Sequence, residues 1–89
     1  MTLEQREFAD HVLARFTPET TREEIEAVLG PSYRQTPGKL YWRRPGAGES
    51  ERIDVYVLNE RIFKIRYMSI SPIWGYDLNA EGNRLVPVD

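Results

Sequence analysis

ERIDVYVLNERIFKIRYM, residues 51–68, is the stretch of sequence that decides the predicted fold. Apolar side chains occupy every second position on both sides of the polar pair Asn59-Glu60. Before this pair they are Ile53, Val55 and Val57, and after it they are Phe63, Ile65 and Tyr67. Alternation with a period of two around a short polar break predicts an antiparallel β-hairpin with one apolar face. That face needs a cover, and we expect residues 1–30 to supply it.

Two amphipathic helices are predicted ahead of the hairpin, at about 2–16 and 21–29, because apolar residues recur there at helical spacing. Capping-box patterns mark where both helices begin: Thr2 with Gln5, and Thr20 or Thr21 with Glu23 or Glu24. Pro18 and Pro31 follow the two helices and prevent their continuation. The second helix is too short to be stable alone, so we expect it to pack on another element.

The remaining segments predict a meander of strands. We expect strands at about 39–44, 52–58 and 61–68, with residues 73–88 as an edge hairpin. Helices followed by antiparallel strands predict an α+β fold, with two N-terminal helices packed on one face of a three- to five-stranded antiparallel meander. This two-layer sandwich would form a single domain over 1–89. The expected inner layer is Phe8, Val12, Leu13, Phe16, Ile25, Val28, Leu29, Leu40, Trp42, Ile53, Val55, Val57, Phe63, Ile65 and Tyr67.

Composition narrows the class of protein. The chain has 89 residues and no Cys, so disulfides and thiolate metal sites are excluded, and a reducing compartment fits. The first residues lack the apolar core of a signal peptide, and no apolar run reaches the ~18 residues of a membrane span, so we expect a cytoplasmic protein. A net charge of −2 argues against a general nucleic-acid binder.

Charge is unevenly distributed along the chain. Residues 1–30 hold three Arg against seven acidic residues, a net charge of −4. Residues 31–68 hold eight basic residues against four acidic ones, a net charge of +4. The predicted sheet is therefore basic, and most of its cations are Arg, which suits interfaces because the guanidinium group pairs with planar acceptors in two places. Biased genomic composition is the alternative explanation.

Catalytic chemistry has little support in the sequence. His11 is the single histidine and lies one helical turn after Glu7, so it is either a general base or metal ligand, or a solvent-facing residue that pairs with Glu7. No second His and no Cys would complete a metal site, and no serine has the local motif of a nucleophile. We therefore predict no catalytic residue, no metal and no cofactor, and a protein that is not an enzyme.

The outer face of the sheet is the candidate site for a partner. By alternation, this face should carry Tyr41, Arg43, Arg52, Asp54, Tyr56, Lys64 and Arg66. Tyr and Arg are enriched at binding hot spots, and Trp74 and Tyr76 are two further candidates as anchors or as residues packed under the C-terminal segment. The alternative is a solvated face on which Asp54 forms cross-strand ion pairs with Lys64 or Arg66.

Residues 20–68 resemble the SmpA/OmlA-like or β-lactamase-inhibitor-protein-like family. The resemblance lies in T-x-x-E-I-x-x-x-L-G-P-S from Thr21 to Ser32, the aromatic pair Tyr41-Trp42, and the hairpin from Ile53 to Ile65. Here Pro31 follows Gly30 directly, one place earlier than in the family pattern, and there is no Cys to carry a lipid. The resemblance implies a helix–helix–three-strand fold and the binding of other proteins, since the family includes an enzyme inhibitor and an accessory of outer-membrane β-barrel assembly.

Two functions follow as hypotheses. The first is a small bacterial immunity or inhibitor protein, which neutralises a toxin or another enzyme by covering its surface. The second is a structural or assembly subunit, for example a homodimer that pairs through an edge strand within 73–88.

Overall fold

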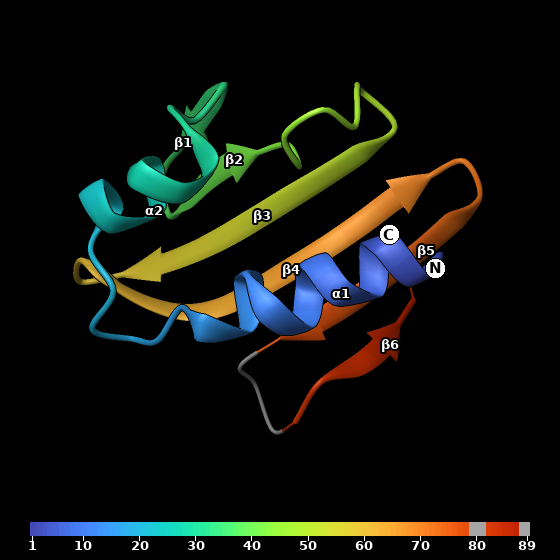
Figure 1. Cartoon of the computed structure of the whole chain (residues 1–89). Coiled ribbons are helices and arrows are strands. Elements are labelled where there is room, and N and C mark those ends of the chain that lie inside the picture. The colour runs from blue at the N-terminus through green and yellow to red at the C-terminus, as the bar shows by residue number, and fades with distance from the viewer. Residues whose placement is uncertain (79–81, 88–89) are drawn as a thin grey trace.

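The computed structural model describes residues 1–78 and 82–87 and shows an α+β sandwich (Figure 1). The predicted fold class and the antiparallel sheet are confirmed. The helical elements are α1 Leu3–His11, the 3₁₀ turn η1 Leu13–Arg15 and α2 Arg22–Leu29, and the strands are β1 Arg34–Thr36, β2 Lys39–Trp42, β3 Glu51–Leu58, β4 Arg61–Ile70, β5 Ile73–Leu78 and β6 Arg84–Val86. None of the helices in this described part has the length and apolar character needed to cross a bilayer.

The sheet has six strands within the described residues, and each pairs antiparallel with the next along the chain. The predicted number of three to five strands is therefore wrong. One additional strand is β1, which forms a short hairpin with β2 where we expected irregular chain. The predicted edge hairpin over 73–88 falls on β5 and β6, although residues 79–81 and 88 lie outside the described residues.

Both helices begin where the capping patterns indicate. Thr2 accepts a hydrogen bond from the backbone of Gln5, and Thr21 accepts one from the backbone of Glu24, and in each box the second side chain reaches back to the cap. The first helix is shorter than predicted, because the α-helical turns end at His11 and η1 continues the chain. Gly30 ends α2 with a φ of +82°, a conformation that glycine adopts without steric cost.

Side chains from both helical segments and from β2–β5 meet in one core. Figure 1 shows α1 and α2 on the same side of the sheet. The ring of Phe8 on α1 meets Tyr67 on β4 edge-on at 5.5 Å, and the indole of Trp42 on β2 donates to the carbonyl of Gly30 at 2.7 Å. The core is Ala9, Leu13, Phe16, Ile25, Leu29, Leu40, Trp42, Ile53, Val55, Ile62, Ile65, Tyr67, Tyr76 and Leu78.

A β-bulge in the β3–β4 hairpin changes which side chains enter the core. Tyr56 pairs with Lys64 but the next residue, Val57, pairs with Ile62, so Phe63 is an extra residue on β4. Ile62 is buried in the core, whereas Phe63 is 52 % exposed and its ring lies 5.8 Å from that of Tyr56. The prediction of Phe63 as a core residue is wrong because the extra residue breaks the alternation.

Val28 is the second wrong assignment to the inner layer. Ile25 and Leu29, one helical turn apart on α2, are buried against the sheet. Val28 lies on the flank of the helix and is 51 % exposed. A helix as short as α2 buries only the narrow stripe that faces the sheet.

The bulge predicts that substitutions of two adjacent residues lower the free energy of unfolding by clearly different amounts. Ile62→Ala should lower the free energy of unfolding by about 2–5 kcal/mol, because it leaves a cavity in the core. Phe63→Ala should lower it by at most about 1 kcal/mol, since only the exposed contact with Tyr56 is lost. Urea denaturation of both variants measures the difference, and equal losses would contradict the bulge.

Candidate functional site

The sheet face opposite the helices, named here the open face, carries a row of side chains across all six strands, and five of the six are charged. Residues that are paired across neighbouring strands project from the same face. The row runs Arg34, Tyr41, Asp54, Arg66, Asp77 and Arg84 from β1 to β6. Except at Tyr41, the sign of the charge alternates along the row. The antiparallel register therefore assembles this surface from strands that span fifty residues of sequence between Arg34 and Arg84.

Two bidentate ion pairs hold arginines of the open face in place. Arg52 donates to both carboxylate oxygens of Asp54 at 2.7 and 3.1 Å, and Arg66 donates to both oxygens of Asp77 at 2.8 and 3.3 Å. Burial is the largest influence on Arg52 and acts to lower its pKa, but the hydrogen bonds to Asp54 together with the attraction of Asp54 and the nearby tyrosines raise the Arg52 pKa overall. Both carboxylates are buried, so each guanidinium group compensates a charge that the sheet excludes from water.

Cations also lie over the aromatic rings of this face. Lys64 Nζ lies 4.1 Å and Lys39 Nζ 5.0 Å from the centre of the Tyr56 ring, and the guanidinium group of Arg43 lies 3.7 Å from that of Tyr33. Such contacts hold flexible side chains in defined positions. Among the described residues, cationic side chains on the open face outnumber its two carboxylates: Arg34, Lys39, Arg43, Arg52, Lys64, Arg66 and Arg84, with Arg61 opposite Leu58 at the hairpin end.

The structure brings most of the predicted partner-binding residues together and separates two of them. The open face contains Tyr41, Arg43, Arg52, Asp54, Tyr56, Lys64 and Arg66. Trp74 and Tyr76 lie on the other face, where Trp74 packs edge-on against Tyr67 at 5.0 Å and Tyr76 belongs to the core. Of the two roles that the sequence left open for these residues, their contacts agree with packing more than with anchoring a partner.

Sequence reasoning missed an apolar group at one end of the open face. Tyr56, Leu58 and Phe63, named here the hairpin patch, lie at the end of the β3–β4 hairpin, with Phe63 52 % and Leu58 64 % exposed. The connecting residues Asn59 and Glu60 have φ values of +51° and +66°, typical of the tight turns that join two strands. The adjacent apolar residues Ile62 and Phe63 were the one available signal of a break in the alternation.

A buried polar network ties α1 to the sheet on the helix side. Glu51 on β3 accepts bonds from Arg44 at 2.8 and 3.0 Å, from Gln5 of α1 at 2.9 Å, and from the hydroxyl of Tyr67. The Arg44 hydrogen bonds, helped by those from Tyr67 and Gln5, outweigh burial and lower the pKa of Glu51 from 4.5 to about 2. Burial, and then the Glu51 carboxylate, raise the pKa of Tyr67. All these hydrogen bonds join groups within the chain, so the network stabilises the fold by connecting α1, β3 and β4.

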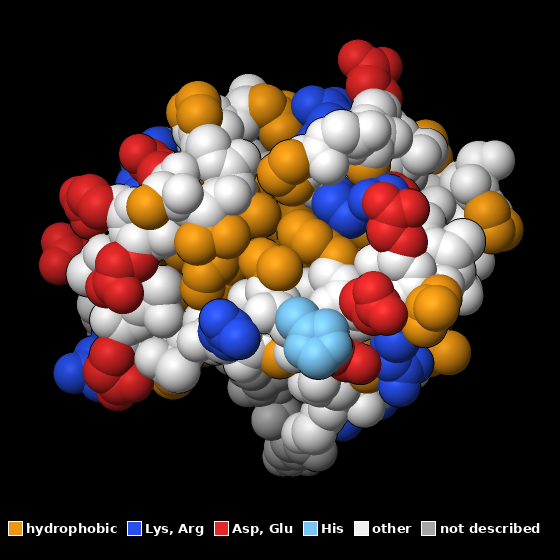
Figure 2. Space-filling view, viewed as in Figure 1, with side chains coloured by type: hydrophobic (Ala, Val, Ile, Leu, Met, Phe, Trp, Pro, Cys, Tyr) orange, Lys and Arg blue, Asp and Glu red, His pale blue; other side chains and the backbone are white. Residues whose placement is uncertain are grey.

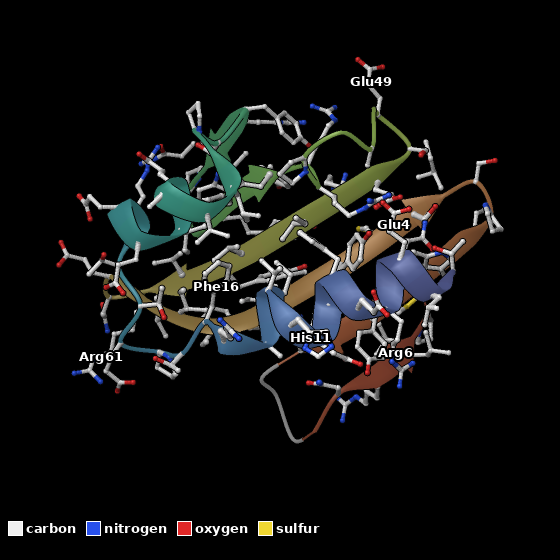
Figure 3. All side chains as sticks on the ribbon, viewed as in Figure 1. Glu4, Arg6, His11, Phe16, Glu49 and Arg61 are labelled. Carbon is white, nitrogen blue, oxygen red and sulfur yellow. The ribbon has the colours of Figure 1, made fainter. Side chains whose placement is uncertain are left out.

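A hollow of about 480 Å³ lies between α1 and α2 (Figure 2). Its apolar lining is Phe8, Val12, Val28, Leu29 and Pro45, and its polar lining is Glu4, Glu7, His11 and Arg44. Figure 3 shows His11 on α1, and this side chain is exposed. Within the described residues, no group of three or more His, Asp or Glu side chains could hold a metal ion. The hollow is an apolar surface with His11, Glu4 and Glu7 in its polar lining.

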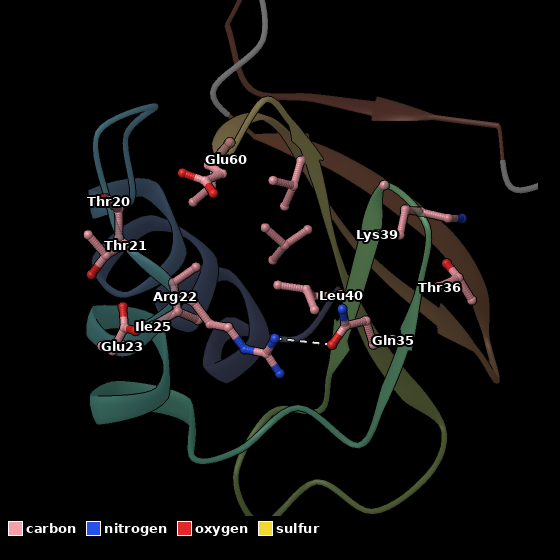
Figure 4. A pocket seen from close by; sticks show the side chains of 14 residues that line it. Thr20, Thr21, Arg22, Glu23, Ile25, Gln35, Thr36, Lys39, Leu40 and Glu60 are labelled. Carbon is pink, nitrogen blue, oxygen red and sulfur yellow. Dashed lines mark hydrogen bonds between the residues drawn. The ribbon is translucent and has the colours of Figure 1, made fainter.

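A second cavity, of about 600 Å³, opens between the start of α2 and the ends of β1–β4 (Figure 4). Arg22 crosses it and donates to Gln35 of β1 at 3.0 Å. The same guanidinium group also donates to Glu26 at 2.8 Å and to Ser32 at 3.3 Å. Because Arg22 is already bonded on three sides, it holds α2 against the edge of the sheet.

The Glu51 network predicts a loss of stability in acid. Because the folded pKa of Glu51 is depressed, its contribution is complete above pH 4.5 and is lost as the pH falls toward 2. Glu51→Gln should cost about 3 kcal/mol at pH 7, because Arg44 loses its buried counter-charge. Urea denaturation should show this difference from wild type shrinking between pH 4.5 and 2. Glu4→Gln, which removes the exposed partner of Arg44, is the control and should have little effect.

Comparison with known proteins gives no assignment: no protein-family model, no curated protein and no solved structure matches the chain. The resemblance to the SmpA/OmlA-like family therefore stays a prediction.

Proposed function

We propose that this chain is a non-enzymatic protein-binding module that acts as an inhibitor or immunity protein and covers its target with the open face. The observation that carries this proposal is the excess of cations on that face. Cationic side chains surround two buried carboxylates on this face, and Arg34 and Arg84 at its two edges are exposed. A surface of this charge complements an acidic region of a partner.

The side-chain arrangement supports binding as well as solvation. The bidentate pairs and the cation–ring contacts hold Arg52, Lys64 and Arg43 in position before a partner arrives. Side chains that are already ordered lose less conformational entropy on binding. An enzyme whose substrate site is acidic, and which acts on cationic groups, is a partner of matching charge. Covering such a site would block access of the substrate.

Charge reversal on the open face tests this proposal. Tagged protein captures a partner from its host, the partner is identified by mass, and the purified pair is titrated calorimetrically. Arg34→Glu and Lys64→Glu should each weaken binding by about tenfold or more, and high salt should weaken wild-type binding in the same direction. Arg15→Glu, an equal change of charge on the helical side, is the control and should have no effect.

Three results would contradict the proposal. Equal weakening by Arg15→Glu would place the interface elsewhere, and an affinity independent of salt would remove its electrostatic basis. A captured enzyme that keeps full activity in the complex would exclude inhibition while leaving the module's binding intact.

Self-assembly is the second candidate function, and strand β6 favours it. β6 is the edge of the described sheet, and Leu85 on this strand is 66 % exposed. An edge strand with an exposed apolar side chain can pair with a second copy of itself. Sedimentation at micromolar concentration distinguishes the two candidates: a stable dimer that Leu85→Lys dissociates supports assembly, and a monomer contradicts it.

A further inference from the structure

The hairpin patch, Tyr56, Leu58 and Phe63, is an apolar surface that the core does not require. The bulge on β4 places Ile62 in the core and turns Phe63 outward against Tyr56, with ring centres 5.8 Å apart. Leu58 follows Tyr56 two positions later on β3, so it projects from the same face and is 64 % exposed. Bulges often re-aim one side chain next to a functional surface.

The patch stands on a rigid support. Val55 and Ile65, which pair across the two strands below it, are fully buried. Asn59 and Glu60 close the hairpin in the left-handed conformation, so the strand ends are joined by the shortest common turn. An aromatic ring on such a support buries a large area at a small cost in conformational entropy.

Two ammonium groups flank the patch on the same face. Lys64 Nζ lies 4.1 Å and Lys39 Nζ 5.0 Å from the centre of the Tyr56 ring. Lys39 also pairs loosely with Asp54 at 3.9 Å. Both amines therefore lie within reach of a carboxylate that enters beside Tyr56.

We propose that the hairpin patch is the anchor of the open face, and that it binds an acidic segment of a partner protein. An apolar side chain of that segment packs on Phe63 and Leu58, and an adjacent Asp or Glu pairs with Lys64 and Lys39. This inference rests on the proposed function and specifies where on the face the affinity arises. Hot spots of this kind combine a buried aromatic contact with surrounding polar contacts.

Selection of peptides tests the anchor before the natural partner is identified. The full-length chain is immobilised and a displayed library of short random peptides is selected on it. Enriched peptides should combine an aromatic or aliphatic residue with neighbouring Asp or Glu. Synthetic copies should bind at least about tenfold more weakly to Phe63→Ser than to wild type. Val28→Ser, which removes an apolar side chain that is 51 % exposed on α2, on the helix side of the sheet, is the matched control and should bind as wild type does.

The outcomes separate the anchor from the wider proposal. Peptides that lose affinity for Arg34→Glu, which lies on the open face but outside the hairpin patch, and not for Phe63→Ser would overturn the anchor and leave the open face as the binding surface. Peptides indifferent to both variants, or no enrichment at all, would overturn both. Thermal unfolding followed by circular dichroism verifies that Phe63→Ser is folded, as its exposed position leads us to expect.

Two other occupants are also distinguished. A wild-type dimer in sedimentation that Phe63→Ser dissociates would mean that a second copy occupies the patch, and would overturn the proposal. Single-stranded DNA stacks on aromatic rings of basic surfaces. Displacement of the selected peptides by oligothymidine, at a concentration below that at which polyglutamate displaces them, would overturn it in favour of nucleic acid.

Discussion

The register of the β3–β4 hairpin is the constraint on which both faces of the sheet depend. A shift of one residue moves a side chain from the core to the surface, and the extra residue at Phe63 does this at one point only. Below the bulge, Val55 and Ile65 face the helices while Asp54 and Arg66 face outward. Beyond it, Ile62 closes the core and Phe63 emerges on the open face. The same feature completes the packing and creates the hairpin patch.

The two faces of the sheet differ in how their buried carboxylates are paired. On the helix side, the buried carboxylate of Glu51 accepts hydrogen bonds from Arg44, Gln5 and Tyr67. The bond from Gln5 connects α1 to the sheet. On the open face, the buried carboxylates Asp54 and Asp77 are each neutralised by one bidentate arginine, and Lys39 adds only a loose contact with Asp54. The first arrangement uses its charges inside the fold, whereas the second leaves an excess of positive charge for the exterior.

Local patterns determined what the sequence could predict. The capping boxes at Thr2 and Thr21 and the alternation from Ile53 to Val57 depend on neighbouring residues, and the structure agrees with them. The short strand β1 has no apolar residue to identify it, although its partner β2 follows directly in the sequence. The burial of Tyr76 depends on packing with residues distant in the sequence, which no local pattern contains. Phe63 is intermediate, because the adjacent apolar pair Ile62-Phe63 conflicts with strict alternation, but only the pairing with Tyr56 and Val57 shows which residue turns outward.

An arginine that is already paired can still contribute to an interface. Arg52 uses its Nε and Nη2 groups on Asp54, and its Nη1 group has no hydrogen-bond partner among the described residues. A fixed guanidinium group can donate to an incoming acceptor without the entropy cost of ordering a free chain. Complementary charge of this kind raises the association rate and fixes orientation more than it adds affinity. Affinity therefore has to come from apolar area that loses its contact with water on binding. Leu58 and Phe63 supply such area next to Lys39 and Lys64, and Ile70 and Ile73 supply it at the β4–β5 end of the same face.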